Sequence, residues 1–378
     1  MKYICLVASL FCITFINAQY SVRLVVTSVA TRGQEDVYVT GNFNNWNPKD
    51  ENYKLKPFVG GRKAVVLKDL PAGTYAFKFT RGGADKLETT ADGRDISDRI
   101  LEVTADDSKE YTIAGWKDDY PDKPKPYTAS PQVKIIDTAF PIPQLGRTRR
   151  IWVYLPKGYA TSSKTYPVLY MQDGQNLFNE QTAFAGEWGI DECLDTLQQK
   201  TGKECIIVGI DNGGSKRMNE YNPYDHAQYG KGEGEQYLAF LVNTLKPYID
   251  QKYRTRKGVA TTFIAGSSMG ALISFYALLK HPDVFGGAGV FSPSFPIAPG
   301  KFTEAEKFTP PPGTLNYKCY LYAGKQESAD MVPAAEKMAA ILQKKAGVYT
   351  RLLIYPLGKH NEATWRQEFA SFYSWLMN

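Results

Sequence analysis

Five residues in the second half of the chain, Gly266 to Gly270, constrain its fold most, because they read Gly-Ser-Ser-Met-Gly. They follow the apolar run Thr262 to Ala265 and precede a helix-like stretch that begins at Ala271. A Gly-x-Ser-x-Gly pattern at a strand-to-helix turn lifts its serine out of a sheet, with a backbone N–H beside it. The pattern predicts a strand, a sharp turn and a helix, with Ser268 as a candidate nucleophile. A plain glycine-rich turn is the alternative.

Short apolar runs alternate with amphipathic stretches over residues 132–378. The runs 167–171, 205–210 and 287–291 have the composition of buried strands, and residues 235–253, 271–280 and 333–345 have that of helices. Strands that are apolar throughout, with helices between them, indicate a mostly parallel sheet covered on both faces. We therefore expect a doubly wound α/β domain with its site at the carboxyl ends of the strands.

A nucleophilic serine needs a base, and the chain has 3 histidines. His360 lies in a loop after the apolar run 352–355 and before a C-terminal helix, where a base can reach the ends of the strands. His281 falls at the expected end of helix 271–280, where an imidazole meets the last carbonyl groups favourably. His226 lies in a polar, aromatic loop and contacts either a ligand or solvent. We expect His360 to be the base.

An acidic residue should orient the histidine. The expected strand 317–322 runs into the segment 323–330, which offers Glu327 and Asp330. Glu327 lies one turn beyond Gly324 and best matches a loop that reaches back to the imidazole of His360. Glu327 is therefore the favoured acid and Asp330 its rival, whereas a helix-capping charge is the alternative role for Glu327.

Backbone N–H groups should receive the negative charge that develops on a carbonyl oxygen. The expected strand 167–171 leads into a loop, 172–178, that contains Gly174. We expect the N–H groups of Met269 and Gln175 to form an oxyanion hole, with a tight surface turn as the alternative for the loop.

The loop 211–223, which follows the strand 205–210, is rich in hydrogen-bonding side chains. Arg217, Glu220 and Tyr221 are its candidate substrate-binding residues. The alternative is an ordered surface loop in which Arg217 pairs with Glu220. Trp188 either stacks on the substrate or packs in the core.

Residues 19–115 have the pattern of an all-β domain. Runs rich in β-branched and aromatic residues at 22–26, 36–40, 63–67, 73–79 and 100–103 are separated by turn-forming residues. These runs predict a small β-sandwich, in which Trp46 is either a sugar platform or a core residue. A segment rich in proline and charge, 116–131, is expected to link it to residues 132–378.

Residues 1–18 have the pattern of a secretory signal peptide, with cleavage after Ala18, so we expect a secreted or periplasmic protein. The remaining cysteines, Cys193, Cys205 and Cys319, show no metal-ligand spacing and are expected to be packed thiols. The net charge of +6 comes from scattered residues, which argues against nucleic acid as a partner. We expect no metal, no cofactor and no membrane span, and the sequence does not indicate the oligomeric state.

Several of these motifs together resemble the putative-esterase family of α/β-hydrolases, which includes feruloyl and acetyl-xylan esterases of carbohydrate esterase family one and siderophore esterases. The resemblance covers about residues 132–378 and rests on Leu169 to Phe178, Gly266 to Gly270, Gly324 to Glu327 and Gly358 to His360. It implies Ser268, Glu327 and His360 as a catalytic triad. Many feruloyl esterases have Asp where this chain has Glu327, which keeps Asp330 as a rival.

Residues 41–48 and 75–82 resemble the immunoglobulin-like carbohydrate-binding modules of family 48. The two resemblances imply a serine carbohydrate esterase that removes feruloyl or acetyl groups from a plant polysaccharide such as xylan. A siderophore or other small-ester esterase with a structural N-terminal sandwich is the alternative. A glycan-binding protein with an inactive second domain is a third reading, although all residue types of a triad are present.

Overall fold

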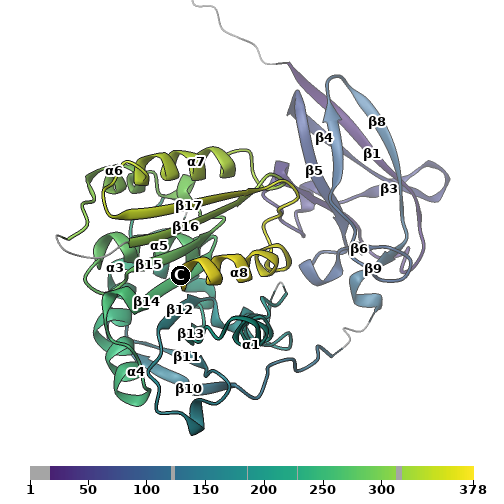
Figure 1. The fold of residues 1–378 in the computed structure, drawn as a ribbon. Coiled ribbons are helices and arrows are strands. Elements are labelled where there is room, and N and C mark those ends of the chain that lie inside the picture. The colour runs from purple at the N-terminus through teal and green to yellow at the C-terminus, as the bar shows by residue number, and fades with distance from the viewer. Residues whose placement is uncertain (1–17, 121–123, 185, 228, 312–316) are drawn as a thin grey trace, which may run out of the picture. The chain divides into compact units, whose positions relative to one another are not determined.

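The computed structural model describes residues 18–120, 124–184, 186–227, 229–311 and 317–378. The chain forms two compact units that divide between residues 123 and 124 (Figure 1). The predicted signal peptide lies outside the described residues except for Ala18, and so do residues 121–123 of the predicted linker. Within the described ranges, no helix has both the length and the apolar character needed to cross a membrane.

The first unit is an all-β domain built on two main sheets. The larger sheet has the strand order β3-β4-β1-β8, the smaller has the order β2-β5-β7, and β6 pairs with β9. The strands are β1 (Gln19–Val29), β2 (Tyr38–Gly41), β3 (Lys56–Phe58), β4 (Arg62–Pro71), β5 (Gly73–Thr80), β6 (Glu88–Thr89), β7 (Arg99–Val103), β8 (Asp107–Ile113) and β9 (Gly115–Trp116). Apolar side chains of both sheets, such as Leu24 and Phe77, form one core.

Two tryptophans of this unit have opposite environments. Trp116, predicted as the first linker residue, is fully buried because β9 pairs with β6 and carries its indole into the core. Trp46 is 41% exposed and lies in a left-handed turn with φ of 56°. Of the two readings of Trp46, the core position is therefore wrong, and its ring is on the surface of the module.

The second unit contains one sheet of eight strands in the order β10-β11-β13-β12-β14-β15-β16-β17. They are β10 (Val133–Ile142), β11 (Arg147–Tyr154), β12 (Val168–Gln172), β13 (Ile206–Ile210), β14 (Thr262–Ser267), β15 (Gly287–Phe291), β16 (Tyr317–Gly324) and β17 (Val348–Tyr355). β11 is antiparallel to both β10 and β13, and the other neighbouring pairs are parallel. The expected mostly parallel α/β sheet is confirmed.

Helices cover both faces of this sheet (Figure 1). They are α1 (Ile190–Thr201), α2 (Arg217–Glu220), α3 (Gly234–Phe240), α4 (Lys246–Lys252), α5 (Met269–Lys280), α6 (Gly300–Lys307), α7 (Met331–Leu342) and α8 (Glu362–Leu376). Apolar side chains of α1 and α8 pack in one core, and those of α3 to α7 pack in the other. Successive residues of β16 enter opposite cores, with Leu321 in one and Tyr322 in the other.

The strand order places a crevice at the centre of the sheet. From β12 the chain passes to β13 on one side, and it later returns through β14 on the other side of β12. The loops that follow β12 and β14 therefore leave the sheet in opposite directions, which is where open α/β sheets bind ligands. Met269 begins the helix after β14, and Gln175 lies in the loop after β12.

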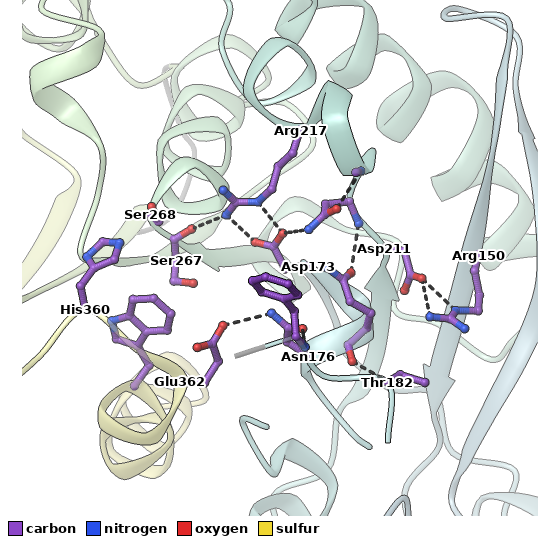
Figure 2. Close-up of a pocket in the computed structure, with 15 residues that line it drawn as sticks. Arg150, Asp173, Asn176, Thr182, Asp211, Arg217, Ser267, Ser268, His360 and Glu362 are labelled. Carbon is purple, nitrogen blue, oxygen red and sulfur yellow. Dashed lines mark hydrogen bonds and ion pairs between the residues drawn. The ribbon is translucent and has the colours of Figure 1, made fainter. Parts of the chain in front are cut away.

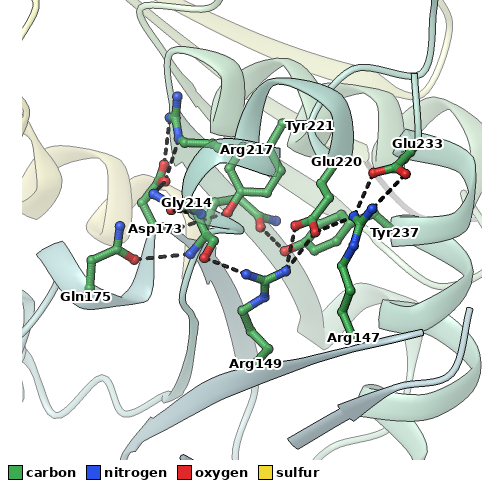
Figure 3. Close-up of polar contacts among 12 residues, drawn as sticks. Arg147, Arg149, Asp173, Gln175, Gly214, Arg217, Glu220, Tyr221, Glu233 and Tyr237 are labelled. Atoms are coloured by element: carbon green, nitrogen blue, oxygen red, sulfur yellow. Dashed lines mark hydrogen bonds and ion pairs between the residues drawn. The ribbon is translucent and has the colours of Figure 1, made fainter. Parts of the chain in front are cut away.

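A buried charge network holds the loop after β13 (Figure 3). Glu220 is fully buried, and its carboxylate accepts hydrogen bonds from Arg149 at 2.7 and 2.8 Å and from Arg147 at 2.8 Å. Arg147 also donates to Glu233, and Arg149 donates to the carbonyl oxygen of Asn212 at 2.6 Å. Both arginines come from β11, so this network ties α2 and the loop before it to the sheet.

We predict that Glu220→Gln destabilises the protein by about 3 kcal/mol or more, because it leaves the buried guanidinium of Arg149 without a countercharge. Glu233→Gln is the matched control: the Glu233 side chain is 23% exposed, so the substitution should cost less than about 1 kcal/mol. Urea unfolding of both variants measures the difference. Equal effects of the two substitutions would contradict the structural role given to Glu220.

Candidate active site

The turn between β14 and α5 presents Ser268 at the carboxyl edge of the sheet. Ser268 has φ of 57° and ψ of −121°, a strained conformation for a residue other than glycine. A Cβ atom on Gly266 would lie only 2.7 Å from the carbonyl carbon of Gly270, so the turn requires glycine there. The Ser268 N–H donates to the carbonyl oxygen of Phe291 at 2.9 Å, which fixes the turn to the end of β15.

The loops after β16 and β17 bring Glu327 and His360 together. Glu327 Oε2 lies 2.7 Å from His360 Nδ1. Glu327 Oε1 accepts hydrogen bonds from the Gly324 N–H at 2.8 Å and from the Ser292 hydroxyl at 2.7 Å. The Glu327 side chain is fully buried, whereas that of His360 is 40% exposed. A buried carboxylate with three partners has a fixed orientation, so it also fixes the imidazole.

Glycine allows these two loops to touch. A Cβ atom on Gly324 would lie 2.3 Å from the carbonyl oxygen of Gly358, and that oxygen accepts a hydrogen bond from the Gln326 N–H at 2.9 Å. Asp330, the rival acid, is exposed just before α7, and its side chain makes no capping hydrogen bond. The structure thus places Glu327, and not Asp330, beside His360.

Sequence reasoning missed Ser292 and Trp365. Ser292 follows β15, is fully buried and has φ of 47°, and its hydroxyl accepts a hydrogen bond from Trp365 Nε1 at 2.8 Å. The Trp365 ring also meets the His360 ring edge-on, with centroids 5.1 Å apart. Ser292 could have been found by the rule that indicated Ser268, because it also follows directly after an apolar run. Trp365 gave no comparable signal.

Ser268 and His360 both line one cavity, which Figure 2 shows in close-up. In the described chain, Ser268 Oγ lies 3.3 Å from Ser294 Oγ and makes no hydrogen bond to the imidazole. A serine hydroxyl reaches different partners in its three staggered rotamers, and catalytic hydrogen bonds commonly tighten only when substrate binds. The backbone geometry therefore brings Ser268 to the same cavity as His360 without the final contact between them.

The loop after β12 is held at Gln175 by hydrogen bonds to both its side chain and its backbone. Its side-chain Oε1 accepts a hydrogen bond from the Asn212 N–H at 3.1 Å, and its carbonyl oxygen accepts one from Thr182 at 2.8 Å. Within the described ranges, the N–H groups of Gln175 and Met269 donate to no protein acceptor. Met269 follows Ser268 directly in the chain, and Gln175 lines the same cavity as Ser268.

Of the four predicted substrate-binding residues, only Arg217 lines the cavity. Its guanidinium forms a bidentate pair with Asp173, at 2.7 and 2.9 Å, so the alternative pairing with Glu220 is wrong. Glu220 and Tyr221 are fully buried and Trp188 is 2% exposed, because each packs behind the cavity wall. Tyr221 accepts a hydrogen bond from the Asp173 N–H at 3.3 Å, and Trp188 packs against Trp365. The structure gives these three residues supporting contacts in place of substrate contacts.

The cavity has a volume of about 760 Å³, and its walls carry both polar and apolar side chains. Its further lining includes Phe184, which is 90% exposed, and the ion pair Arg150–Asp211 at 2.8 Å. Glu362 also lines it and accepts a hydrogen bond from Asn176 at 3.0 Å. Burial raises the pKa of Glu362, so this carboxyl group favours its protonated form more than an exposed one does.

The other histidines lie away from this cavity. The His281 N–H donates to the carbonyl oxygen of Ala277 at the end of α5, which confirms the helix-terminal position expected for it. His226 pairs through its backbone with Gly230, and its ring stacks on Tyr229. Neither is among the residues that line the cavity.

Two protein families match separate parts of the chain. Residues 142–376 match the family described as "Putative esterase", and residues 28–109 match the "Glycogen recognition site of AMP-activated protein kinase". The uncharacterized protein YbbA of Bacillus subtilis is 32% identical over 153 residues, which are 39% of this chain and 57% of YbbA. The chain therefore spans little more than half of that relative.

Two further proteins are similar. An endo-1,4-beta-xylanase/feruloyl esterase of Xylanibacter ruminicola is 28% identical over 151 residues, 39% of this chain and 20% of that protein. The enterobactin esterase FES of Shigella flexneri is 16% identical with a TM-score of 0.54, over 90% of this chain and 88% of that one, a likeness of fold alone. Because this family model matches residues 142–376, more than half of the chain, the chain belongs to the putative esterase family.

Proposed function

We propose that the protein is a serine esterase in which Ser268 is the nucleophile, His360 the general base and Glu327 the residue that orients the imidazole. The observation that carries the proposal is the 2.7 Å contact between His360 Nδ1 and the buried carboxylate of Glu327, at a cavity that Ser268 also lines. A hydrogen bond at Nδ1 leaves Nε2 to accept a proton, which a base for a serine hydroxyl requires.

The reaction then follows the chemistry of acyl transfer. His360 Nε2 takes the proton of Ser268 Oγ as this oxygen attacks the ester carbonyl carbon. The N–H groups of Met269 and Gln175 hold the negative charge of the tetrahedral intermediate, each donor being worth about 10²–10³ in rate. His360 returns the proton to the departing alcohol and leaves an acyl group on Ser268. Water, activated by the same imidazole, releases the acid.

We further propose that the substrate is a feruloyl or acetyl ester on a plant polysaccharide such as xylan, met outside the cytoplasm after removal of residues 1–18. The match of residues 28–109 to a glycogen recognition site supports a glycan partner, and the surface position of Trp46 suits contact with a sugar. A glycan-binding unit joined to an esterase raises the local concentration of ester bonds. The name of the Xylanibacter ruminicola relative points to the same class of substrate.

A siderophore trilactone is the second candidate substrate. The fold likeness to the enterobactin esterase spans 90% of the chain, including the part that matches the glycan module, which is compatible with a purely structural first unit. The two candidates share the triad and the oxyanion hole and differ only in the acyl and alcohol groups.

Ser268→Ala should lower ester hydrolysis by about 10⁴-fold or more, because it removes the hydroxyl that attacks the ester carbonyl carbon. Turnover of 4-nitrophenyl acetate and methyl ferulate measures the loss. Ser371→Ala, at an exposed position of α8, is the matched control and should keep the wild-type rate. Unchanged turnover in the Ser268 variant would refute the mechanism.

Glu327→Gln should lower kcat by about 10³–10⁴-fold with little change in KM, because the amide no longer fixes the imidazole tautomer. Asp330→Asn, at the exposed rival position, should stay within about twofold of the wild type. Steady-state kinetics on one ester substrate, together with matching circular dichroism spectra, compares the two. The reverse order of effects would assign the acid to Asp330.

Product analysis should separate the two substrate classes. We expect ferulate release from feruloylated arabinoxylan oligosaccharides, followed by mass spectrometry, at a rate at least 10-fold above the cleavage of enterobactin under the same conditions, roughly 1.4 kcal/mol of selectivity. Ser268→Ala serves as the blank for both reactions. Preferential cleavage of the trilactone would replace the polysaccharide proposal and leave the triad standing.

A further inference from the structure

Three acidic side chains meet at the start of α1, away from the cavity. Oxygen atoms of Glu187, Asp191 and Glu192 all lie within 4.8 Å of one another. Glu187 is 6% exposed and Asp191 is fully buried, while Glu192 is partly exposed. Like charges at this distance inside a protein repel one another strongly, so the cluster needs a compensating partner.

Each carboxylate presents one buried oxygen without a protein partner. Within the described residues, Glu187 Oε1, Asp191 Oδ1 and Glu192 Oε2 accept no hydrogen bond. The second oxygens of the two most buried groups are held: Thr128 donates to Glu187 Oε2 at 2.9 Å, and the Ser130 N–H donates to Asp191 Oδ2 at 2.7 Å. The carboxylates of Glu187 and Asp191 are therefore each held through one oxygen, and all three residues keep one buried oxygen without a partner.

Among the described residues, no lysine or arginine forms an ion pair with these carboxylates, although the positive charge of Arg366, whose guanidinium lies against Gly189, acts on Glu187. The N-terminus of α1 supplies roughly half a positive charge beside them.

We propose that Glu187, Asp191 and Glu192 form a binding site for a hard divalent cation, calcium. Fixed carboxylate oxygens are the ligands that Ca²⁺ prefers, and water completes its six to eight positions where a protein supplies fewer. No metal site is expected from the sequence alone. Only the turn into α1 brings the three side chains together.

The site would tie together segments that support the cavity. Thr128 and Ser130 belong to the chain that leads into β10, and Glu187 lies in the segment between β12 and α1. Next to the cluster, the Trp188 N–H donates to the carbonyl oxygen of Asn176 at 2.8 Å, one residue beyond Gln175. A bound cation would therefore stabilise the turn that carries a proposed oxyanion donor, without taking part in the ester chemistry.

Terbium luminescence tests this proposal on the full chain. Tb³⁺ replaces Ca²⁺ at oxygen sites, and the indole of Trp188, beside Glu187 in sequence, can sensitise its emission. After treatment with a chelator, we expect saturable emission with one Tb³⁺ per chain that Ca²⁺ displaces. At a Ca²⁺ concentration about 100-fold above Kd, the Tm should rise by about 5 to 10 °C over the chelated protein.

Asp191→Asn and Glu192→Gln should each weaken Tb³⁺ binding at least 10-fold, and Glu192→Gln is the safer variant because its side chain is partly exposed. Glu336→Gln, on the exposed face of α7, removes the same charge and should bind as the wild type does. Saturable emission that both cluster variants lose supports the site. No saturable emission from the wild type, or emission that survives both cluster substitutions, overturns it.

Discussion

The buried carboxylate of Glu327 is the interaction on which the rest of the candidate site depends. The Gly324 N–H and the Ser292 hydroxyl hold one of its oxygens, and the other oxygen orients His360. This arrangement requires β15, β16 and β17 to end at one edge of the sheet and two loops to touch through glycine backbone. An imidazole that is 40% exposed is thereby oriented by groups that water does not reach, so its position is a property of the fold.

The strands of the second unit could be predicted because a buried parallel strand is a short apolar run, which local sequence defines. The runs at 205–210 and 287–291 contain β13 and β15. Regular periodicity predicted one helix over 235–253, where the structure has α3, a π-helical segment at 241–245 and α4. The short π-helical segment depends on how the helix packs in the fold. The local pattern of apolar residues therefore does not predict it.

Side-chain partners were harder to predict than positions at strand ends. The rule that functional residues follow apolar runs found Ser268, Glu327 and His360, yet it could not say which charges of a polar loop turn inward. Arg217 pairs with Asp173, 44 residues earlier, while Glu220 is buried against arginines of β11. Such pairings depend on which loops the sheet brings together, so local sequence carries no signal for them. For the same reason the sequence did not predict the acidic cluster, because its carboxylate oxygens come together only when α1 has formed.

In the proposed mechanism the ends of the sheet carry Ser268, Glu327 and His360, so selectivity for the acyl group would come from the loops that line the rest of the cavity. Phe184 and Trp365 give it apolar surface, and Arg150 and Asp211 give it polar groups that already satisfy one another. An acetyl group would leave most of the 760 Å³ to water, whereas an aromatic acyl group would bury apolar area worth about 25 cal/mol per Å². That area would contribute to catalysis only where it positions the carbonyl carbon beside Ser268, so under the proposed function we expect these walls to favour feruloyl over acetyl esters in kcat/KM.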